Sequence, residues 1–337
     1  MTTTPTRRRP LRTFVRGLLL VAFGLGLALA GFEVLLRAVD PYGYADDQAV
    51  ERFAHELRDP APGARRGLSS FHLRPGAQIE FLGERFDINE RGYRTPLVPH
   101  AKPPDCYRIV VVGDSVPFGW GIAEADCFPR RLETLLNAKP QPFGKARVEV
   151  VNLSGPGRGL GDYLIVLEDE AMAYQPDLVL VPLIFNDVPL SEVDDAPHPS
   201  PPAPLPSWLR WSFAARFAHV TIARLSGAEM HGDYWIGIRS SPKALAAFPL
   251  AFELFRKAAQ GVPILLFDTI GEGPGKGIPE IAAAAKAQGL AHLECFLDLS
   301  EYDTKWAIRA PKHNHPNPAA HAVYAQTLVD WFTRNGW

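Results

Sequence analysis

Four short blocks along the chain contain residue types that can attack and stabilise a carbonyl group. Ser115 lies in Gly-Asp-Ser, and a glycine-rich run surrounds Gly157. Asn186 lies in Ile-Phe-Asn-Asp, and His315 lies in His-Asn-His-Pro. A neutral imidazole can remove the proton of a serine hydroxyl, and backbone N–H groups or an Asn amide can bind an oxyanion. The set therefore indicates nucleophilic catalysis, although each block alone is equally typical of a turn or a helix cap.

The segments around these blocks predict an alternating α/β fold. Short runs rich in Val, Ile and Leu predict strands at residues 107–112, 148–153, 177–183, 262–267 and 295–298. Helical spacing of apolar residues predicts helices at residues 128–138, 164–174, 243–260, 278–288 and 318–333. The alternation implies a parallel five-stranded sheet sandwiched between helices. Ligands bind beyond the carboxyl ends of such strands, and the blocks of Ser115, Gly157 and Asn186 follow the first three strands directly.

The order of the four blocks resembles that of the SGNH/GDSL hydrolase superfamily, which has its Ser, Gly, Asn and His in four blocks in this order. The resemblance covers residues 107–337. The run Phe-Asp-Ile-Asn-Glu-Arg-Gly-Tyr-Arg at residues 86–94 also looks like the lead-in of bacterial membrane-anchored members. The resemblance implies a three-layer α/β fold of the flavodoxin-like kind and an ester hydrolase that needs neither a cofactor nor a metal.

The same resemblance implies a role for each block. Ser115 would be the nucleophile, Asp114 beside it a supporting residue, and His315 the base. The N–H groups of Ser115 and Gly157 and the side-chain amide of Asn186 would form the oxyanion hole. One donor of this kind contributes about 3–4 kcal/mol to transition-state stabilisation in a well-studied protease.

The chain departs from the family pattern just before the histidine. The family usually has an Asp two or three residues before this His, where the chain has His313 and Lys312. Loss of such an orienting carboxylate costs a serine protease about 10⁴ in rate. A Ser–His dyad could suffice, with a backbone carbonyl orienting the imidazole, or the site could bind without catalysis. An acid from elsewhere could also substitute, the candidates being Asp298, Glu301 and Asp303. A second departure is Ile184 where many members have Gly, which could narrow the site.

The other histidines and the cysteines suggest no further chemistry. The three histidines between residues 313 and 321 make a metal site conceivable, but no cluster of cysteines or carboxylates with metal-ligand spacing accompanies them. Cys106 begins the first predicted strand and Cys127 lies beyond the Ser115 loop, so the strand would separate them too far for a disulfide. We therefore predict no metal, and buried thiols as the default for the cysteines.

The first forty residues predict a membrane anchor. Residues 1–16 contain five arginines and no acid, and residues 17–37 are apolar apart from Glu33 and Arg37. Twenty helical residues span about 30 Å, the thickness of a bilayer core, and Glu33 lies near one end, where it can reach the headgroups. The arginine-rich tail should remain cytoplasmic. We therefore expect a single-pass inner-membrane protein with residues 38–337 on the periplasmic or extracellular side.

Other interpretations of this segment remain open. Ala-Leu-Ala at residues 28–30 has the form of a signal-peptide cleavage site, and the run could also be a buried core helix. The apolar run continues beyond residue 30, which favours an uncleaved anchor. Residues 6–11 resemble a twin-arginine signal only weakly, because a proline stands where an aromatic residue is usual.

The remainder of the chain divides into a lead-in, a domain and an insertion. Residues 38–104 form a polar, irregular lead-in with a hairpin around Gly83. The α/β domain is expected over residues 105–337, with a long insertion at about residues 188–242. The insertion contains a proline-rich loop and an aromatic-rich segment, residues 208–225. One interpretation of that segment is a helix packed on the core. The other is an element that forms a wall of the substrate cleft or faces the membrane.

Composition leaves three functional hypotheses. A net charge of −2 over 337 residues argues against nucleic acid as the main partner, and an apolar share of 47 % excludes a disordered chain. The main hypothesis is a serine esterase that removes acyl groups, such as acetyl, from glycans or lipids of the cell envelope. The alternatives are an O-acyltransferase that modifies envelope polysaccharide and a non-catalytic glycan-binding domain.

Overall fold

The computed structural model describes residues 9–40, 44–61, 65–68, 72–184, 187, 205–226, 242–269, 279–295, 297 and 315–336. The chain divides into two compact units. The smaller unit contains helices α1 (Arg9–Val39) and α6 (Phe213–Leu225), and the larger unit contains both β-sheets.

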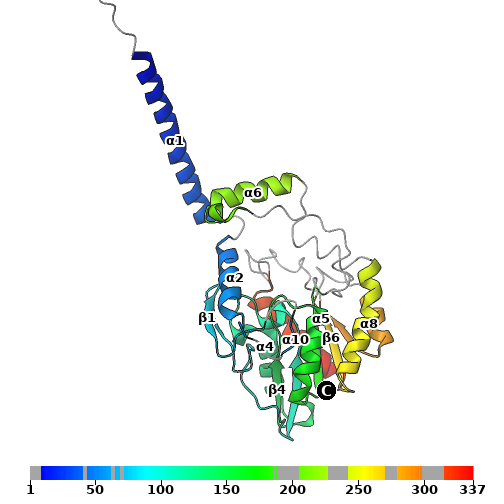
Figure 1. Ribbon diagram of the computed structural model, residues 1–337. Coiled ribbons are helices and arrows are strands. Elements are labelled where there is room, and N and C mark those ends of the chain that lie inside the picture. Colours follow the sequence, from blue (N-terminus) through cyan, green and yellow to red (C-terminus); the bar gives the residue numbers. More distant parts are fainter. Residues whose placement is uncertain are drawn as a thin grey trace, which may run out of the picture. The chain divides into compact units, whose positions relative to one another are not determined.

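A five-stranded parallel sheet forms the centre of the larger unit (Figure 1). Its strands are β3 (Cys106–Val111), β4 (Arg147–Asn152), β5 (Leu178–Leu183), β6 (Ile264–Asp268) and β7 (Ala291–Glu294). They lie in the order β4-β3-β5-β6-β7, and β3 pairs with β4 and β5 so that Val111 faces Asn152 on one side and Leu180 on the other. This is the flavodoxin-like strand order, and it confirms the predicted fold class.

Helices cover both faces of this sheet. They are α4 (Phe128–Asn137) and α10 (Pro318–Arg334) on one face, and α5 (Leu160–Asp169), α8 (Pro242–Ala258) and α9 (Pro279–Ala287) on the other. Successive residues of β3 serve opposite faces, since Ile109 and Val111 pack with α4 and α10 whereas Val110 packs with α5 and α8. A strand that is buried on both faces needs a continuous apolar run, which is why the sequence predicts these central strands well.

The fifth strand lies earlier than the sequence predicts. The apolar stretch at residues 295–298 predicts this strand, but β7 is Ala291–Glu294 and pairs with β6 from Leu265 opposite Ala291 to Asp268 opposite Glu294. β7 is one of the two edge strands of the sheet, and none of its residues is fully buried. An edge strand in this position does not need an apolar run, so hydrophobicity alone places it wrongly.

The lead-in packs as part of the larger unit. The predicted hairpin is present as β1 (Gln78–Phe81) and β2 (Glu84–Asp87), which pair in antiparallel fashion. The expectation of an otherwise irregular segment is wrong, because residues 44–57 form helix α2 (Tyr44–Leu57). Phe53 of α2 is buried among aromatic side chains of the hairpin, and this cluster also takes in Trp120. The helix is therefore stabilised by a tertiary partner that the local sequence does not reveal.

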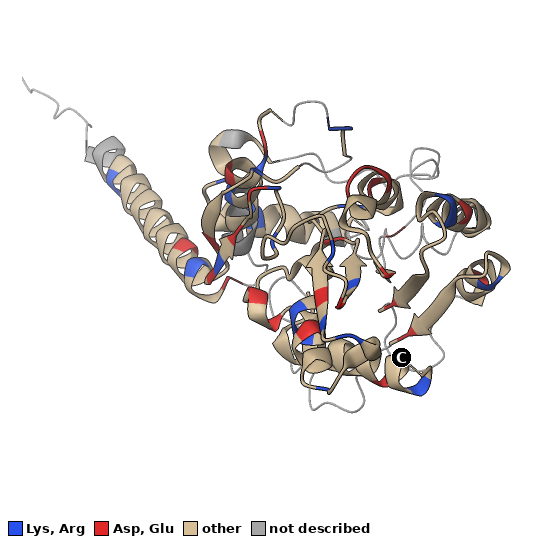
Figure 2. Cartoon of the chain, turned by 90° about the horizontal axis from the view of Figure 1, so that it is seen from below, with Lys and Arg blue, Asp and Glu red and all other residues tan. Residues whose placement is uncertain are grey.

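The smaller unit consists of α1 and the segment that packs on its carboxyl-terminal end. Within α1, Thr13–Val39 is long and apolar enough to cross a membrane, and most of its apolar side chains are exposed, Leu36 being a buried exception. In the coloured part of this helix, Figure 2 marks positions of Lys, Arg, Asp or Glu only near the two ends. α6 packs on α1 through Phe213 and Leu36. The aromatic-rich segment is thus a helix from residue 213 onward, but its partner is α1, so the expectation that it packs on the α/β core is wrong.

Candidate active site

Ser115 lies on the turn that joins β3 to a short helix, α3 (Ser115–Phe118). Asp114 caps this helix, because its Oδ1 accepts the N–H of Val116 at 3.0 Å. A Cβ atom on Gly113 would lie 2.5 Å from Cγ of Pro117, so the close return of the chain over the strand end requires glycine there. The local geometry therefore presents the Ser115 hydroxyl at the carboxyl edge of the sheet.

His315 reaches Ser115 from the other end of the chain. Its Nε2 lies 3.1 Å from Oγ of Ser115, within hydrogen-bond distance. His315 stands just before α10, whose amino end is fixed by Asn317, the side chain of which accepts the N–H groups of Ala319 and Ala320. The structure thus brings together the candidate nucleophile and the candidate base that the sequence singles out, at a distance that would allow proton transfer.

An indole stacks on the imidazole of His315. The ring centroids of Trp120 and His315 lie 5.6 Å apart at an interplanar angle of 30°. Trp120 is in turn held by Phe53 and Phe81 of the lead-in, at centroid distances of 5.0 and 4.6 Å. The lead-in therefore contacts the candidate base through one buried aromatic side chain, a link that the sequence analysis misses although Trp120 follows the Gly-Asp-Ser block closely.

The glycine-rich loop after β4 is folded around a buried arginine. Arg158 is 1 % exposed and donates from Nη1 to the carbonyl of Leu153 at 2.6 Å. A Cβ atom on Gly155 would lie 2.6 Å from the guanidinium carbon, so only glycine leaves room for it. The N–H of Gly155 donates to the carbonyl of Gly113 at 3.1 Å, which continues the β3–β4 pairing beyond the sheet. The loop of Gly157, whose φ is +71°, therefore begins beside the Ser115 turn.

The third block is described only in part. Asn186 lies outside the described residues, as do Lys312, His313 and the candidate orienting acids Asp298, Glu301 and Asp303. Asp187 is buried, and its Oδ2 accepts the N–H of Ile184 at 2.6 Å, so this residue stabilises the turn after β5. Ile184 is itself buried in the hydrophobic cluster beneath α4 and α10. Its side chain therefore serves the core, which gives no support to the expectation that it narrows the site.

A second buried arginine fixes the backbone that follows Ser115. Arg94, at the end of the lead-in motif, donates from Nη1 to the carbonyls of Gly119 and Phe118 at 2.8 and 3.2 Å. Its Nη2 donates to the carbonyl of Ile122 at 2.8 Å, and its guanidinium lies 3.6 Å from the ring centroid of Phe86. These contacts give a structural reason for the motif at residues 86–94.

The hydroxyl of Ser115 has a second acceptor besides His315. It lies 3.0 Å from Oδ2 of Asp114, and a serine has one hydroxyl proton, so it donates to only one of the two at a time. Burial raises the pKa of the Asp114 carboxyl from 3.8 to about 6. An ionised Asp114 competes with the imidazole of His315 for the hydroxyl proton of Ser115, whereas a neutral Asp114 is the weaker acceptor and favours donation to the imidazole.

The raised pKa of Asp114 predicts a pH dependence of stability. The folded state binds the proton of Asp114 more tightly than the unfolded state, so the contribution of the neutral carboxyl is complete below about pH 4 and is lost as the pH rises through about 6. Asp114→Asn keeps an acceptor for Val116 and cannot ionise. Between acid and neutral pH the free energy of unfolding of the wild type, from urea titrations, should fall relative to that of Asp114→Asn by on the order of 3 kcal/mol. A difference that is independent of pH would contradict this.

The other candidate residues are structural. His321 is fully buried, its Nδ1 accepts the N–H of Phe128 at 3.1 Å, and burial lowers its pKa to about 3, so it stays neutral. Cys106, Cys127 and Cys295 are buried free thiols, which confirms that expectation. Within the described part of the chain, no three His, Cys, Asp or Glu side chains come together as a metal site.

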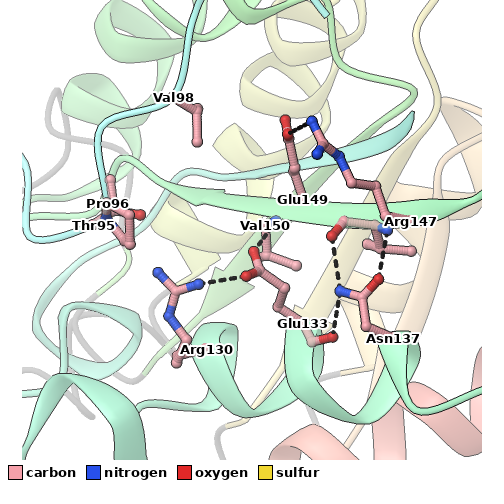
Figure 3. A pocket seen from close by; sticks show the side chains of 10 residues that line it. Thr95, Pro96, Val98, Arg130, Glu133, Asn137, Arg147, Glu149 and Val150 are labelled. Carbon is pink, nitrogen blue, oxygen red and sulfur yellow. Dashed lines mark hydrogen bonds and ion pairs between the residues drawn. The ribbon is translucent and has the colours of Figure 1, made fainter. Parts of the chain in front are cut away.

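A pocket of about 340 Å³ lies at the outer edge of β4, away from these residues (Figure 3). Its polar groups are engaged with one another. Arg130 pairs with Glu133 at 2.5 Å and Arg147 with Glu149 at 2.8 Å, and Asn137 bonds both the N–H and the carbonyl of Val148. Side chains of α4 thus cover the free edge of the strand. Neither Ser115 nor His315 lines this pocket, so we do not place the active site there.

Comparisons with known proteins give distant structural similarity only. No protein-family model matches the chain, and no curated protein matches it. A lipase/acylhydrolase from Enterococcus faecalis is 14% identical, with 68% of this chain and 96% of that chain covered and a TM-score of 0.41. The esterase EstA from Pseudoalteromonas sp. is 14% identical over 67% and 97% of the two chains, with a TM-score of 0.42. The acetylxylan esterase Axe2 from Geobacillus stearothermophilus is 14% identical over 67% and 94%, with a TM-score of 0.39. Similarities of this size do not transfer an activity, so the function rests on the geometry of the site.

Proposed function

We propose that the protein is a serine esterase that works through an acyl-enzyme on Ser115. The observation that carries this proposal is the 3.1 Å approach of Nε2 of His315 to Oγ of Ser115, on a strand–turn–helix connection at the carboxyl edge of a parallel sheet. A hydroxyl in contact with an imidazole is the arrangement that activated serine nucleophiles share.

The chemistry proceeds in two halves. His315 takes the hydroxyl proton while Oγ of Ser115 attacks the ester carbonyl carbon, and the carbonyl oxygen becomes an oxyanion. The N–H groups of Ser115 and Gly157 and the amide of Asn186 are the donors proposed for that oxyanion. The intermediate collapses to an acyl-serine as His315 returns the proton to the departing alcohol. Water, deprotonated by His315, then attacks the acyl carbon, and the bond from that carbon to Oγ breaks as His315 returns the proton to Ser115 and the acid is released.

We further propose that α1 anchors the protein in the inner membrane, with the catalytic unit outside the cytoplasm. The support is a helix with an exposed apolar surface from Thr13 to Val39 and an arginine-rich segment before it. In that compartment the proposed substrates are O-acylated glycans or lipids of the envelope. No cofactor takes part in the proposed reaction.

The experiment that tests the activity is covalent labelling of the full-length protein, in detergent, with a fluorophosphonate probe. The wild type should react at one site, and Ser115→Ala should not react at all, because the probe captures only an activated serine. Ser154→Ala is the matched control, since its hydroxyl is buried in the neighbouring loop, and it should label like the wild type. A folded wild-type protein that does not label would overturn the proposal in favour of a binding domain.

A further inference from the structure

Helix α6 is attached to the carboxyl-terminal end of α1 by a partly buried set of polar contacts. The carboxylate of Glu33 accepts the N–H groups of Phe213 and Ala214 at 3.0 and 2.9 Å and the hydroxyl of Ser212 at 2.9 Å. These N–H groups belong to the first turn of α6 and have no partner within the helix. Glu33 also pairs with Arg37 at 2.7 Å. A charged residue inside an otherwise apolar helix is therefore used to cap a second helix.

Apolar contacts complete this junction. Phe213 packs with Leu36, and the rings of Phe217 and Phe32 meet edge to face with centroids 5.9 Å apart. Arg37 donates to the carbonyl of Trp211 at 2.7 Å. One face of α6 is thus committed to α1, and Figure 1 shows the two helix axes diverging sharply from this junction.

The opposite face of α6 and the turn before it expose large apolar side chains. Trp208 and Trp211 are 70% and 65% exposed, and Ile222 and Leu225 are 65% and 84% exposed. Within α6, the exposed positions 218, 222 and 225 follow one another at helical spacing and form one stripe, and Trp208 and Trp211 are exposed in the turn that precedes the helix. We call Trp208, Trp211, Ala218, Ile222 and Leu225 the exposed stripe. A stripe of this kind is stable only if something apolar covers it.

The charge of the segment indicates what covers it. From Trp208 to Ser226 the sequence contains Arg210, Arg216 and Arg224 and no acidic residue. A basic amphipathic helix with tryptophans on its apolar side is the pattern of helices that lie in the interface of an anionic membrane. Tryptophan itself is enriched at that level of the bilayer.

The position along α1 agrees with this pattern. Arg16 and Glu33 are separated by 17 helical residues, which rise by about 25 Å. If Arg16 lies at the cytoplasmic headgroups, Glu33 and Arg37 lie close to the opposite edge of the hydrocarbon layer. The Glu33 cap fixes the beginning of α6 at the same level.

From these observations we propose that the segment from Trp208 to Ser226 lies in the outer headgroup layer and binds anionic lipid, with the exposed stripe turned into the acyl chains. This inference rests on the membrane anchoring proposed above. The insertion between β5 and α8 would then provide a second, interfacial contact with the bilayer besides α1, and Glu33 would be the residue that couples the two.

The test uses the full-length protein in vesicles of phosphatidylethanolamine and phosphatidylglycerol, with the environment-sensitive dye NBD on single introduced cysteines, since the native thiols are buried. Ile222→Cys reports on the exposed stripe, Leu25→Cys on α1, and Leu97→Cys on the larger unit. The native side chains at these three positions are 65%, 60% and 52% exposed, in that order. Quenching by lipids that are brominated near the headgroup or near the bilayer centre measures how deeply the dye lies in the bilayer. Quenching by aqueous iodide measures how accessible the dye is to water.

The two proposals make separate predictions in this experiment. The Ile222 dye should show a blue-shifted emission and lose fluorescence mainly to shallow bromines, the Leu25 dye mainly to deep bromines, and the Leu97 dye mainly to iodide. Deep quenching at Leu25 with iodide quenching at Ile222 would overturn the interfacial helix and leave the anchor standing. Absence of lipid quenching at Leu25 would overturn the anchor and this inference with it. Cross-linking of Ile222→Cys between two copies, without lipid quenching, would identify a second copy as the occupant and also overturn the inference.

Discussion

Replacing either Ser115 or His315 by alanine should lower ester hydrolysis by about 10⁴- to 10⁶-fold, and the double variant should be no slower than the slower single one. The reason is that Oγ and Nε2, 3.1 Å apart, act as one unit: without the base the hydroxyl is not deprotonated, and without the hydroxyl the base has no nucleophile. Turnover of a soluble acetyl ester by the three purified variants measures this. Losses that multiply in the double variant would mean that the two residues act independently, against the proposed mechanism.

His321 provides the matched control for this prediction. His315→Ala should leave the melting temperature nearly unchanged, because the imidazole is only half-buried and faces the site. His321→Ala should instead lower the melting temperature, since it leaves the buried N–H of Phe128 without its acceptor and opens a cavity beside that ring. The two histidines thus separate catalysis from folding. Unaltered activity in His315→Ala would shift the role of base to another residue.

The parts of this structure that the sequence predicts are those fixed by local patterns. Continuous apolar runs predict β3, β4, β5 and β6 because these strands are buried on both faces. Helices α4, α8, α9 and α10 begin and end within a few residues of the expected positions, because a single apolar face repeats at helical spacing. The proximity of Ser115 and His315 is also expected from the sequence, but that expectation depends on a family resemblance and on the topology of the sheet. No local pattern predicts it.

The parts that the sequence did not predict depend on tertiary partners. α2 is stabilised as a helix because Phe53 and Leu57 pack against the apolar side chains of the hairpin. β7 is a strand because its backbone pairs with that of β6. Glu33 looks like an unfavourable interruption of an apolar helix until α6 provides the N–H groups that it caps. The local sequence does not explain why such positions have a polar or an aromatic residue. The reason is a contact with a segment that lies far away in the chain.

Trp120 is the second residue for which we expect a large effect. Trp120→Ala should lower kcat by about 10²-fold with little change in KM, because it removes the ring that stacks on His315 and lets the imidazole leave its alignment with Oγ of Ser115. Substrate binding does not depend on that alignment, whereas proton transfer does. Steady-state kinetics at a temperature where the variant remains folded measure the two constants separately.

Two further variants distinguish positioning of His315 from loss of stability. Trp120→Phe keeps an aromatic face and should restore most of kcat. Phe53→Ala removes the support of Trp120 without touching His315, and it should destabilise the fold by about 3–5 kcal/mol while reducing kcat far less than Trp120→Ala does. If Phe53→Ala and Trp120→Ala lose stability and kcat in parallel, the indole only holds the fold together. If they separate, with kcat lost only in Trp120→Ala, the indole itself positions the imidazole of His315, and Phe53 contributes to stability alone.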